Sequence, residues 1–236
     1  MLWMAAFHFC FDLNHFGLLQ ENFHRDPFWT TQRTAIVSLF LFTAGLSQAM
    51  AVHRGQSWPR FWRRWAQIAG AALLVTAGSV AMFPNSFIYF GVLHGIALML
   101  IVARCTAGWG VWLWPLGAAG LALPWLAPWA IAQWPMLEVL NTPWLNWLGF
   151  ISHKPVTEDY VPLLPWLGVL WWGVAAGQWA LRHRRHWLGG PGHASKTGSS
   201  TLYRGLVTLG QWSLSFYLLH QPVLLGLIGL GVYLSP

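Results

Sequence analysis

Three polar residues in the first hydrophobic stretch could carry out acid–base chemistry together. His8, Asp12 and His15 are separated by four and three positions, so a helix would place them on one face. A carboxylate one turn away from an imidazole can fix the tautomer of the ring and raise its basicity. The spacing therefore favours a site in which histidine moves a proton, and a purely structural hydrogen-bonded cluster is the alternative.

The same three side chains also invite a metal hypothesis, because histidine and aspartate are common zinc ligands. A structural zinc site needs four protein ligands, and the neighbouring sequence offers no obvious fourth one. We therefore expect no metal here. Cys10 and Cys105 both lie in apolar runs, where we expect them to act as small hydrophobic residues.

The composition indicates an integral membrane protein. Of the 236 residues, 56% are hydrophobic and only 8% are charged, and 19 are tryptophan. A soluble domain of this size could not bury so much apolar surface. Uncharged runs long enough to cross a hydrocarbon core of about 30 Å occur at residues 34–52, 65–83, 86–103, 105–137, 160–181 and 205–236. We expect an all-α, multi-pass bundle of about seven or eight transmembrane helices.

The formal charge of +7 is concentrated in two connectors. One connector holds Arg54, Arg60, Arg63 and Arg64, and the other holds Arg182, Arg184, Arg185, Lys196 and Arg204. The positive-inside rule predicts that both are cytoplasmic and that the protein lies in the cell's inner membrane. This placement argues against a nucleic-acid partner. The arginines could contact anionic lipid, and Arg63, Arg64 and Arg182 could also bind a phosphate group.

We expect one domain over residues 1–236, with a first helix at residues 1–19 that is barely long enough to span, which favours a start upstream of Met1. Residues 122–165 contain seven prolines and should form extracytoplasmic half-helices and loops. Residues 182–204 should form a mobile basic cytoplasmic loop. Pro222 should kink or break the last helix. Gly45, Gly173 and Gly177 have the small size suited to close helix packing.

Further polar residues inside or beside the spans are binding candidates. His94 and His220 lie within apolar runs, where an ionisable side chain is a functional candidate and a satisfied interior histidine is the alternative. Gln221 follows His220 directly. Asn14 and Arg33 could donate hydrogen bonds to a developing oxyanion.

Five segments together resemble the bacterial relatives of heparan-α-glucosaminide N-acetyltransferase, a branch of the transmembrane acyltransferases. They are residues 7–13 (FHFCFDL), 39–45 (LFLFTAG), 87–94 (FIYFGVLH), 159–168 (DYVPLLPWLG) and 217–222 (YLLHQP). Each motif alone is degenerate and apolar, so the specificity lies in their order and spacing. The resemblance covers nearly the whole chain.

The resemblance implies acetyl transfer from cytosolic acetyl-CoA to an amino sugar or glycan on the far side of the membrane, and a possible homodimer. It implies that His24, in the loop after the first helix, matches the histidine used by the lysosomal members. His8 matches a polar position near the acyl group, with Asp12 as its partner. The Arg-Gly pair that usually opens the first family helix and the large luminal domain of the lysosomal members have no counterpart here.

On this hypothesis a histidine removes the proton of the attacking amine or hydroxyl group. Coenzyme A would enter from the basic face, with its pantetheine arm between the first, second, fourth and seventh spans. A proton-coupled transporter of a small polar solute is the rival, because intramembrane histidine and aspartate serve transport equally well. A non-catalytic membrane partner of a glycan-export system is a third possibility.

Overall fold

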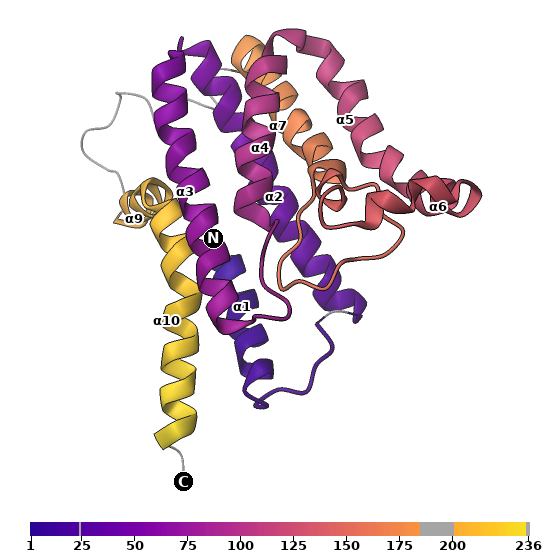
Figure 1. Ribbon diagram of the computed structural model, residues 1–236. Coiled ribbons are helices and arrows are strands. Elements are labelled where there is room, and N and C mark those ends of the chain that lie inside the picture. The colour runs from indigo at the N-terminus through magenta and orange to yellow at the C-terminus, as the bar shows by residue number, and fades with distance from the viewer. Residues whose placement is uncertain (24, 185–200, 235–236) are drawn as a thin grey trace. The chain divides into compact units, whose positions relative to one another are not determined.

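The computed structural model describes residues 1–23, 25–184 and 201–234. The chain forms two compact units, one of residues 1–37 with 189–236 and one of residues 38–188. The secondary structure of the described residues is helical (Figure 1), apart from an isolated parallel bridge between Phe90 and Tyr160. The chain is therefore an all-α protein over its described ranges, as its composition predicts.

The first unit is built on α1 (Leu2–His15), the beginning of α2 (Pro27–His53), α9 (Thr201–Gln211) and α10 (Ser213–Leu234). Helices α1 and α10 pack against each other. His8 lies against His220, and a Cβ atom on Gly229 would lie 3.3 Å from the ring of Phe16. Residue numbers rise from His8 to Phe16 along α1 and from His220 to Gly229 along α10, so the two helices run parallel.

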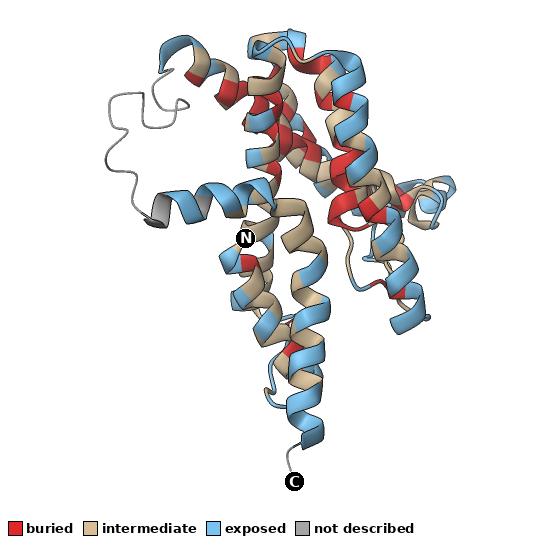
Figure 2. Ribbon diagram, turned by 90° about the vertical axis from the view of Figure 1, so that its left-hand side faces the viewer, coloured by how far each residue is buried: buried red, intermediate tan, exposed pale blue. Residues whose placement is uncertain are grey.

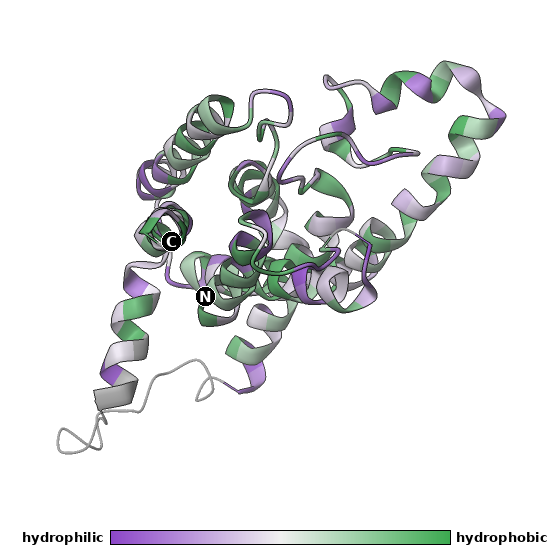
Figure 3. Cartoon of the chain, turned by 90° about the horizontal axis from the view of Figure 1, so that it is seen from below, coloured by the Kyte–Doolittle hydropathy of each residue, from purple (hydrophilic) through white to green (hydrophobic). Residues whose placement is uncertain are grey.

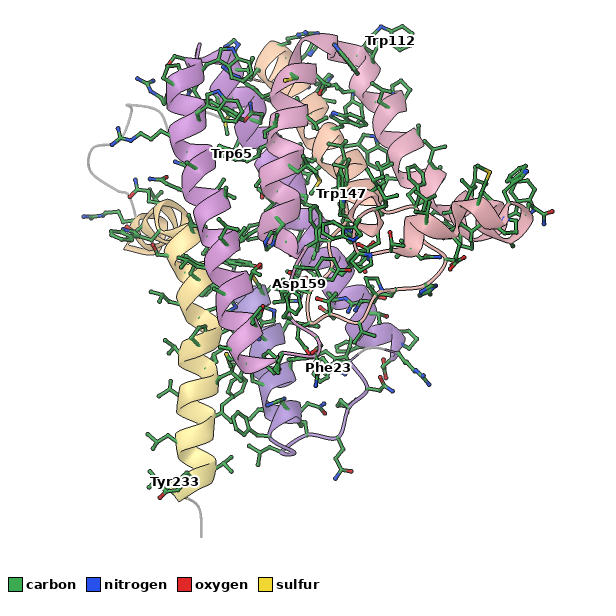
Figure 4. All side chains as sticks on the ribbon, viewed as in Figure 1. Phe23, Trp65, Trp112, Trp147, Asp159 and Tyr233 are labelled. Atoms are coloured by element: carbon green, nitrogen blue, oxygen red, sulfur yellow. The ribbon has the colours of Figure 1, made fainter. Side chains whose placement is uncertain are left out.

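An aromatic cluster holds α1 to the start of α2. The indole Nε1 of Trp3 donates to Gln32 Oε1 at 2.6 Å. One turn further along α1, Phe7 makes edge contacts with Phe23 and Trp29, whose own rings stack at 4.1 Å between centroids. Phe23 is only 4% exposed and is labelled in Figure 4. The loop after α1 therefore folds back and makes α1 and α2 antiparallel.

The second unit contains the rest of α2 with α3 (Trp58–Met82), α4 (Val92–Thr106), η1 (Ala107–Trp112), α5 (Leu113–Ala122) and α7 (Leu163–His183). Helix α5 packs against α7, α3 against α4, and α4 against α7. Buried residues, red in Figure 2, run along these contacts. Its largest fully buried apolar side chains come from four of the helices: Leu41, Met99, Leu113, Leu170 and Val174.

The proline-rich segment at residues 122–165 forms short helices: η2 (Leu123–Leu126), α6 (Ala127–Gln133), η3 (Pro135–Asn141) and η4 (Asn146–Leu148). Proline stands at the first or second position of η2, α6 and η3. Proline is favoured there because its missing N–H is not needed in a first turn. The prolines thus begin new short helices and prevent one long helix.

Four segments of the described chain are long and apolar enough to cross a membrane. They are Pro27–His53, Trp58–Met82, Val92–Gln133 and Ser213–Leu234, and hydrophobic residues, green in Figure 3, run along the helices. The third segment passes through several consecutive helices between α4 and α6. By length and composition the structure therefore supports a membrane protein, and it does not confirm seven or eight spans.

Several boundaries differ from those predicted. Pro222 lies inside a continuous α10, and the helical run is interrupted at Trp212. Apolar helices tolerate proline where neighbouring groups satisfy the freed carbonyl. The predicted loop at residues 182–204 is shorter, because Arg182 belongs to α7 and residues 201–204 belong to α9, while residues 185–200 lie outside the described residues. Arg63 and Arg64 lie on α3 and not in a connector.

Glycines allow α2 and α7 to approach closely, as their size predicts. A Cβ atom on Gly45 would collide with the carbonyl oxygen of Leu170, and one on Gly173 would collide with that of Phe42. One turn further on, a Cβ on Gly177 would lie 2.7 Å from that of Ala49. Small residues four positions apart on both helices thus form the contact.

We predict that Gly45→Ala lowers the free energy of unfolding by about 1–3 kcal/mol, because the added methyl group forces the backbones apart. The matched control is Gly78→Ala in α3, where a Cβ meets nothing within 4 Å. That change should be neutral or stabilising by up to about 1 kcal/mol, since alanine favours a helix more than glycine does. Equal melting temperatures for the two purified variants in detergent would contradict this account of the contact.

Candidate active site

Two histidines from opposite ends of the sequence form a pair in the first unit. His8 Nδ1, on α1, lies 2.7 Å from His220 Nε2, on α10. The rings are nearly parallel, with an interplanar angle of 12° and centroids 4.9 Å apart. The structure therefore brings together two residues that the sequence suggested separately.

Backbone carbonyl groups fix the tautomer of the pair. His220 Nδ1 lies 2.8 Å from the carbonyl oxygen of Tyr217 and 3.1 Å from that of Phe216. A carbonyl oxygen can only accept, so His220 Nδ1 must carry a proton. In the neutral pair His220 Nε2 is then an acceptor, and the proton between the rings belongs to His8 Nδ1.

The remaining nitrogen of His8 is consequently an unprotonated base. His8 Nε2 makes no hydrogen bond to any described residue, and the side chain is half-buried. A histidine that activates a nucleophile has the same arrangement, in which a partner group orients its other ring nitrogen. Here the orienting group is a second imidazole, where a carboxylate was expected.

Asp12 lies one turn along α1 from His8 and is only 1% exposed. Its polar neighbours are the side chain of Gln221 and the imidazole of His15. Neither carboxylate oxygen reaches hydrogen-bonding geometry with a described residue. His15 itself is exposed. The three residues lie on one helix, as predicted, with His8 paired to His220 and Asp12 buried beside Gln221 and His15.

The other candidates of this unit have different surroundings. Asn14 Oδ1 accepts from the backbone N–H of Glu21 at 2.7 Å and so closes the loop after α1. Arg33 is half-buried on α2. His24 lies outside the described residues, so its predicted role stays a prediction.

In the second unit, His94 stabilises the beginning of α4. Its Nδ1 accepts from the backbone N–H of Gly91 at 3.3 Å. Its Nε2 lies 3.0 Å from Thr76 Oγ1, and the Thr76 hydroxyl donates to the Ile88 carbonyl at 2.7 Å. Both ring nitrogens therefore have partners, with the proton on Nε2. This is the satisfied interior histidine that the sequence left open as the alternative.

Two loops meet at the same end of α4. Asp159 Oδ2 accepts from the backbone N–H of Val92 at 2.7 Å, which places a carboxylate at a helix N-terminus. Thr157 Oγ1 donates to the Phe87 carbonyl at 2.8 Å, and Asp159 is labelled in Figure 4. The loop before α4 and the loop before α7 are thus joined by side chains that cap and cross-link them.

Asn146 forms a polar centre next to these loops. The sequence did not identify this residue as a candidate. It is 1% exposed, and its Nδ2 donates to the hydroxyl of Tyr89 at 2.8 Å. The hydroxyl of Tyr160 donates to the backbone carbonyl oxygen of Asn146 at 2.6 Å. Burial raises the pKa of Tyr89 and of Tyr160, so both phenols stay protonated at neutral pH. The sequence did contain a signal for this contact. Residues 87–94 and 159–168, two of the segments on which the family resemblance rests, each contain one tyrosine.

Arginines gather at the other end of α3 and α4. Arg63 and Arg64 are exposed on the first turns of α3, and Arg182 is exposed at the end of α7. Arg104, which sequence reasoning did not select, lies over the ring of Trp58 at 5.1 Å. Its Nη2 donates to the carbonyl oxygen of Gln56, while its Nη1 is buried with no partner among the described residues.

Among residues 1–23, 25–184 and 201–234, no group of three or more His, Cys, Asp or Glu side chains could hold a metal ion.

Residues 1–222 match the family described as heparan-alpha-glucosaminide N-acetyltransferase, catalytic. The chain belongs to this family. The match includes α1, α2, the second unit and α10 as far as Pro222, so it spans the histidine pair. It confirms the resemblance drawn from the five segments. Searches among curated proteins and solved structures found no match.

Membership of this family identifies the chain as a membrane acetyltransferase in its broad class. An acetyltransferase of this kind needs a base to remove a proton from its acceptor. His8 Nε2 is one imidazole nitrogen of the first unit that makes no hydrogen bond to a described residue.

We predict that ring-labelled histidine will show His8 with a protonated Nδ1 and a bare Nε2 in ¹⁵N spectra at neutral pH. His220→Phe removes the acceptor and should release this preference, whereas His153→Phe, at an exposed loop position, should leave the His8 signals unchanged. A proton on His8 Nε2 in the unchanged protein would disprove the tautomer assignment.

Proposed function

We propose that this protein transfers an acetyl group from acetyl-CoA to an amino sugar or glycan, with His8 as the general base. The observation that carries the proposal is the pair of His8 and His220. It leaves one imidazole nitrogen unprotonated within a helix pair that the family match includes.

The acceptor nitrogen forms a bond to the acetyl carbonyl carbon, the carbon–sulfur bond breaks, and the N–H proton goes to His8 Nε2. His8 then returns that proton to the departing sulfur, which leaves as a thiol. The products are an N-acetylated sugar and coenzyme A.

His220 supports this step by sharing the charge that His8 gains. When Nε2 takes a proton, the N–H at His8 Nδ1 points at an imidazole lone pair 2.7 Å away. A hydrogen bond with one charged partner is about twice as strong as a neutral one. The imidazolium is therefore stabilised when it forms, which lowers the barrier.

Two further groups are proposed to act at the reacting carbonyl. Arg33 and the Nδ2 group of Asn14 can donate hydrogen bonds to the oxyanion that develops there. His24 is retained as a second catalytic histidine on the resemblance alone. Asp12 is retained in the site, although its carboxylate does not bond to His8 in the described structure.

The arginines of the second unit fit the phosphate groups of coenzyme A. Guanidinium groups bind phosphate in a bidentate manner, and Arg63, Arg64 and Arg182 are exposed. The buried Arg104 Nη1 has a hydrogen to donate and no described acceptor. A phosphate oxygen would satisfy it. His94 remains a candidate neighbour of the cofactor, on the basis of its apolar setting.

The same proposal includes the domain organisation, the membrane orientation and the partners of the protein. Residues 1–236 form one functional domain, since the family match covers most of both units. The basic ends face the cytoplasm across a cell's inner membrane, with seven or eight passages through it. A homodimer is proposed from the resemblance, and lipid contact from the exposed apolar helix faces.

We predict that His8→Gln lowers kcat/KM for acetyl transfer about 10²–10⁴-fold, because a positioned general base contributes that much. Purified protein, radiolabelled acetyl-CoA and a panel of amino sugars provide the measurement. His53→Gln, at an exposed helix end, is the control and should retain full activity. His24→Gln should also lose transfer.

Two results would overturn the proposed function. Full activity in His8→Gln would exclude His8 as the base. Solute flux in liposomes by a protein that does not bind coenzyme A would identify a transporter.

A further inference from the structure

Large apolar side chains cover the outside of the proline-rich segment. We call residues 123–148, which contain η2, α6, η3 and η4, the tryptophan arm. Helix α6 packs against η2 and η3, and its buried residues are Ala127 and Ile131. Six large apolar side chains of the arm are more than half exposed: Trp125, Leu126, Trp129, Trp134, Met136 and Trp144. Exposed apolar surface of this kind marks a region that contacts a partner or a membrane.

Contacts with α7 fix the level at which the tryptophan arm leaves the second unit. A Cβ atom on Gly117 of α5 would collide with Trp172, whereas one on Gly120 would lie 3.4 Å from the side chain of Leu164. Helices α5 and α7 are therefore antiparallel, and the arm begins beside the first turn of α7. The arm also ends there, because a Cβ atom on Gly149 would collide with the backbone of Leu164. Helix α6 runs in a different direction from α5 (Figure 1).

That level corresponds to one boundary of a membrane that α7 would cross. Helix α7 has 21 residues, so it is about 31 Å long, close to the ~30 Å thickness of a hydrocarbon core. Arg182 lies in the last turn of α7, at the opposite end from the arm. The candidate membrane segment Val92–Gln133 continues into the arm as far as the end of α6. The apolar surface of the arm is thus continuous with the surface that faces lipid.

The composition of the tryptophan arm is typical of a segment at a membrane boundary. Glu138 is its single charged residue, and it holds five of the 19 tryptophans. Tryptophan is enriched at membrane boundaries because its ring is apolar and its N–H group can donate a hydrogen bond. The indole N–H groups of Trp125 and Trp129 make no hydrogen bond to a described residue. They can donate to water and to the ester carbonyl groups of lipid.

We propose that the tryptophan arm lies in the plane of the membrane, between the headgroups and the hydrocarbon, and anchors the α5–α7 pair to phospholipid. Its apolar side chains enter the hydrocarbon, and its indole N–H groups face the ester carbonyl region. The arm has no arginine or lysine, so its attachment does not require anionic lipid. The anchor is independent of acetyl transfer, since it needs only lipid.

Site-directed spin labelling tests the position of the tryptophan arm. The free cysteines, Cys10 and Cys105, are replaced with alanine, and the full chain is reconstituted in phosphatidylcholine vesicles. A nitroxide is attached to Trp129→Cys. Its depth is measured from collisions with oxygen, which dissolves in lipid, and with a nickel chelate, which stays in water. We expect a depth of about 5–10 Å below the headgroups, as for other segments that lie in the interface.

Two exposed positions of the second unit serve as controls. Val156→Cys, in a loop, should be fully accessible to the nickel chelate, and Leu39→Cys, near the middle of α2, should lie deeper than Trp129→Cys. Trp125→Cys repeats the measurement at a second position of the arm. Adding phosphatidylglycerol to the vesicles should leave the depth unchanged.

Three results would overturn the anchor. Nickel accessibility at Trp129→Cys and Trp125→Cys equal to that at Val156→Cys would show a loop in water. A depth equal to that at Leu39→Cys would show a spanning segment. A second copy of the chain on the arm would exclude both reagents and broaden the spectra through contact between two labels. A depth of 5–10 Å that appears only with phosphatidylglycerol would also contradict the proposal, because it would require an electrostatic attachment.

Discussion

The hydrogen bond between His8 Nδ1 and His220 Nε2 is the interaction on which the proposed chemistry depends. It defines the protonation of both rings, because the carbonyl groups of α10 already hold the other His220 proton. It also joins the first helix to the last one, which are adjacent only in the folded protein. A change in the packing of α1 on α10 would therefore change the protonation of His8 as well as the fold.

A polar network of a different kind organises the second unit. His94, Asp159 and Asn146 are all engaged in hydrogen bonds that hold loops against the beginning of α4. Each has a buried or half-buried position, so the loss of a partner would leave an uncompensated polar group. These residues hold the loops in place. By contrast, the Asp12 carboxylate oxygens and Arg104 Nη1 are buried and make no hydrogen bond to a described residue.

Composition and apolar runs were sufficient to predict an all-helical membrane protein. In lipid the backbone polar groups must bond to one another, and a helix satisfies them. The close approach at Gly45 and Gly173 could also be predicted from residue size. The partner of His8 could not, since a contact over more than two hundred positions leaves no local signal. Pro222 is the opposite case. A proline at this position predicts a kink or break, but α10 continues through it.

Affinity labelling can show whether the acetyl group of the donor reaches His8, as the proposed function requires. Bromoacetyl-CoA places an electrophilic carbon where the acetyl group of the donor would lie, and mass spectrometry identifies the alkylated residue. We expect modification of His8 at Nε2, protection by excess acetyl-CoA, and an unmodified His220. Labelling confined to His24 or to residues of the second unit would contradict it.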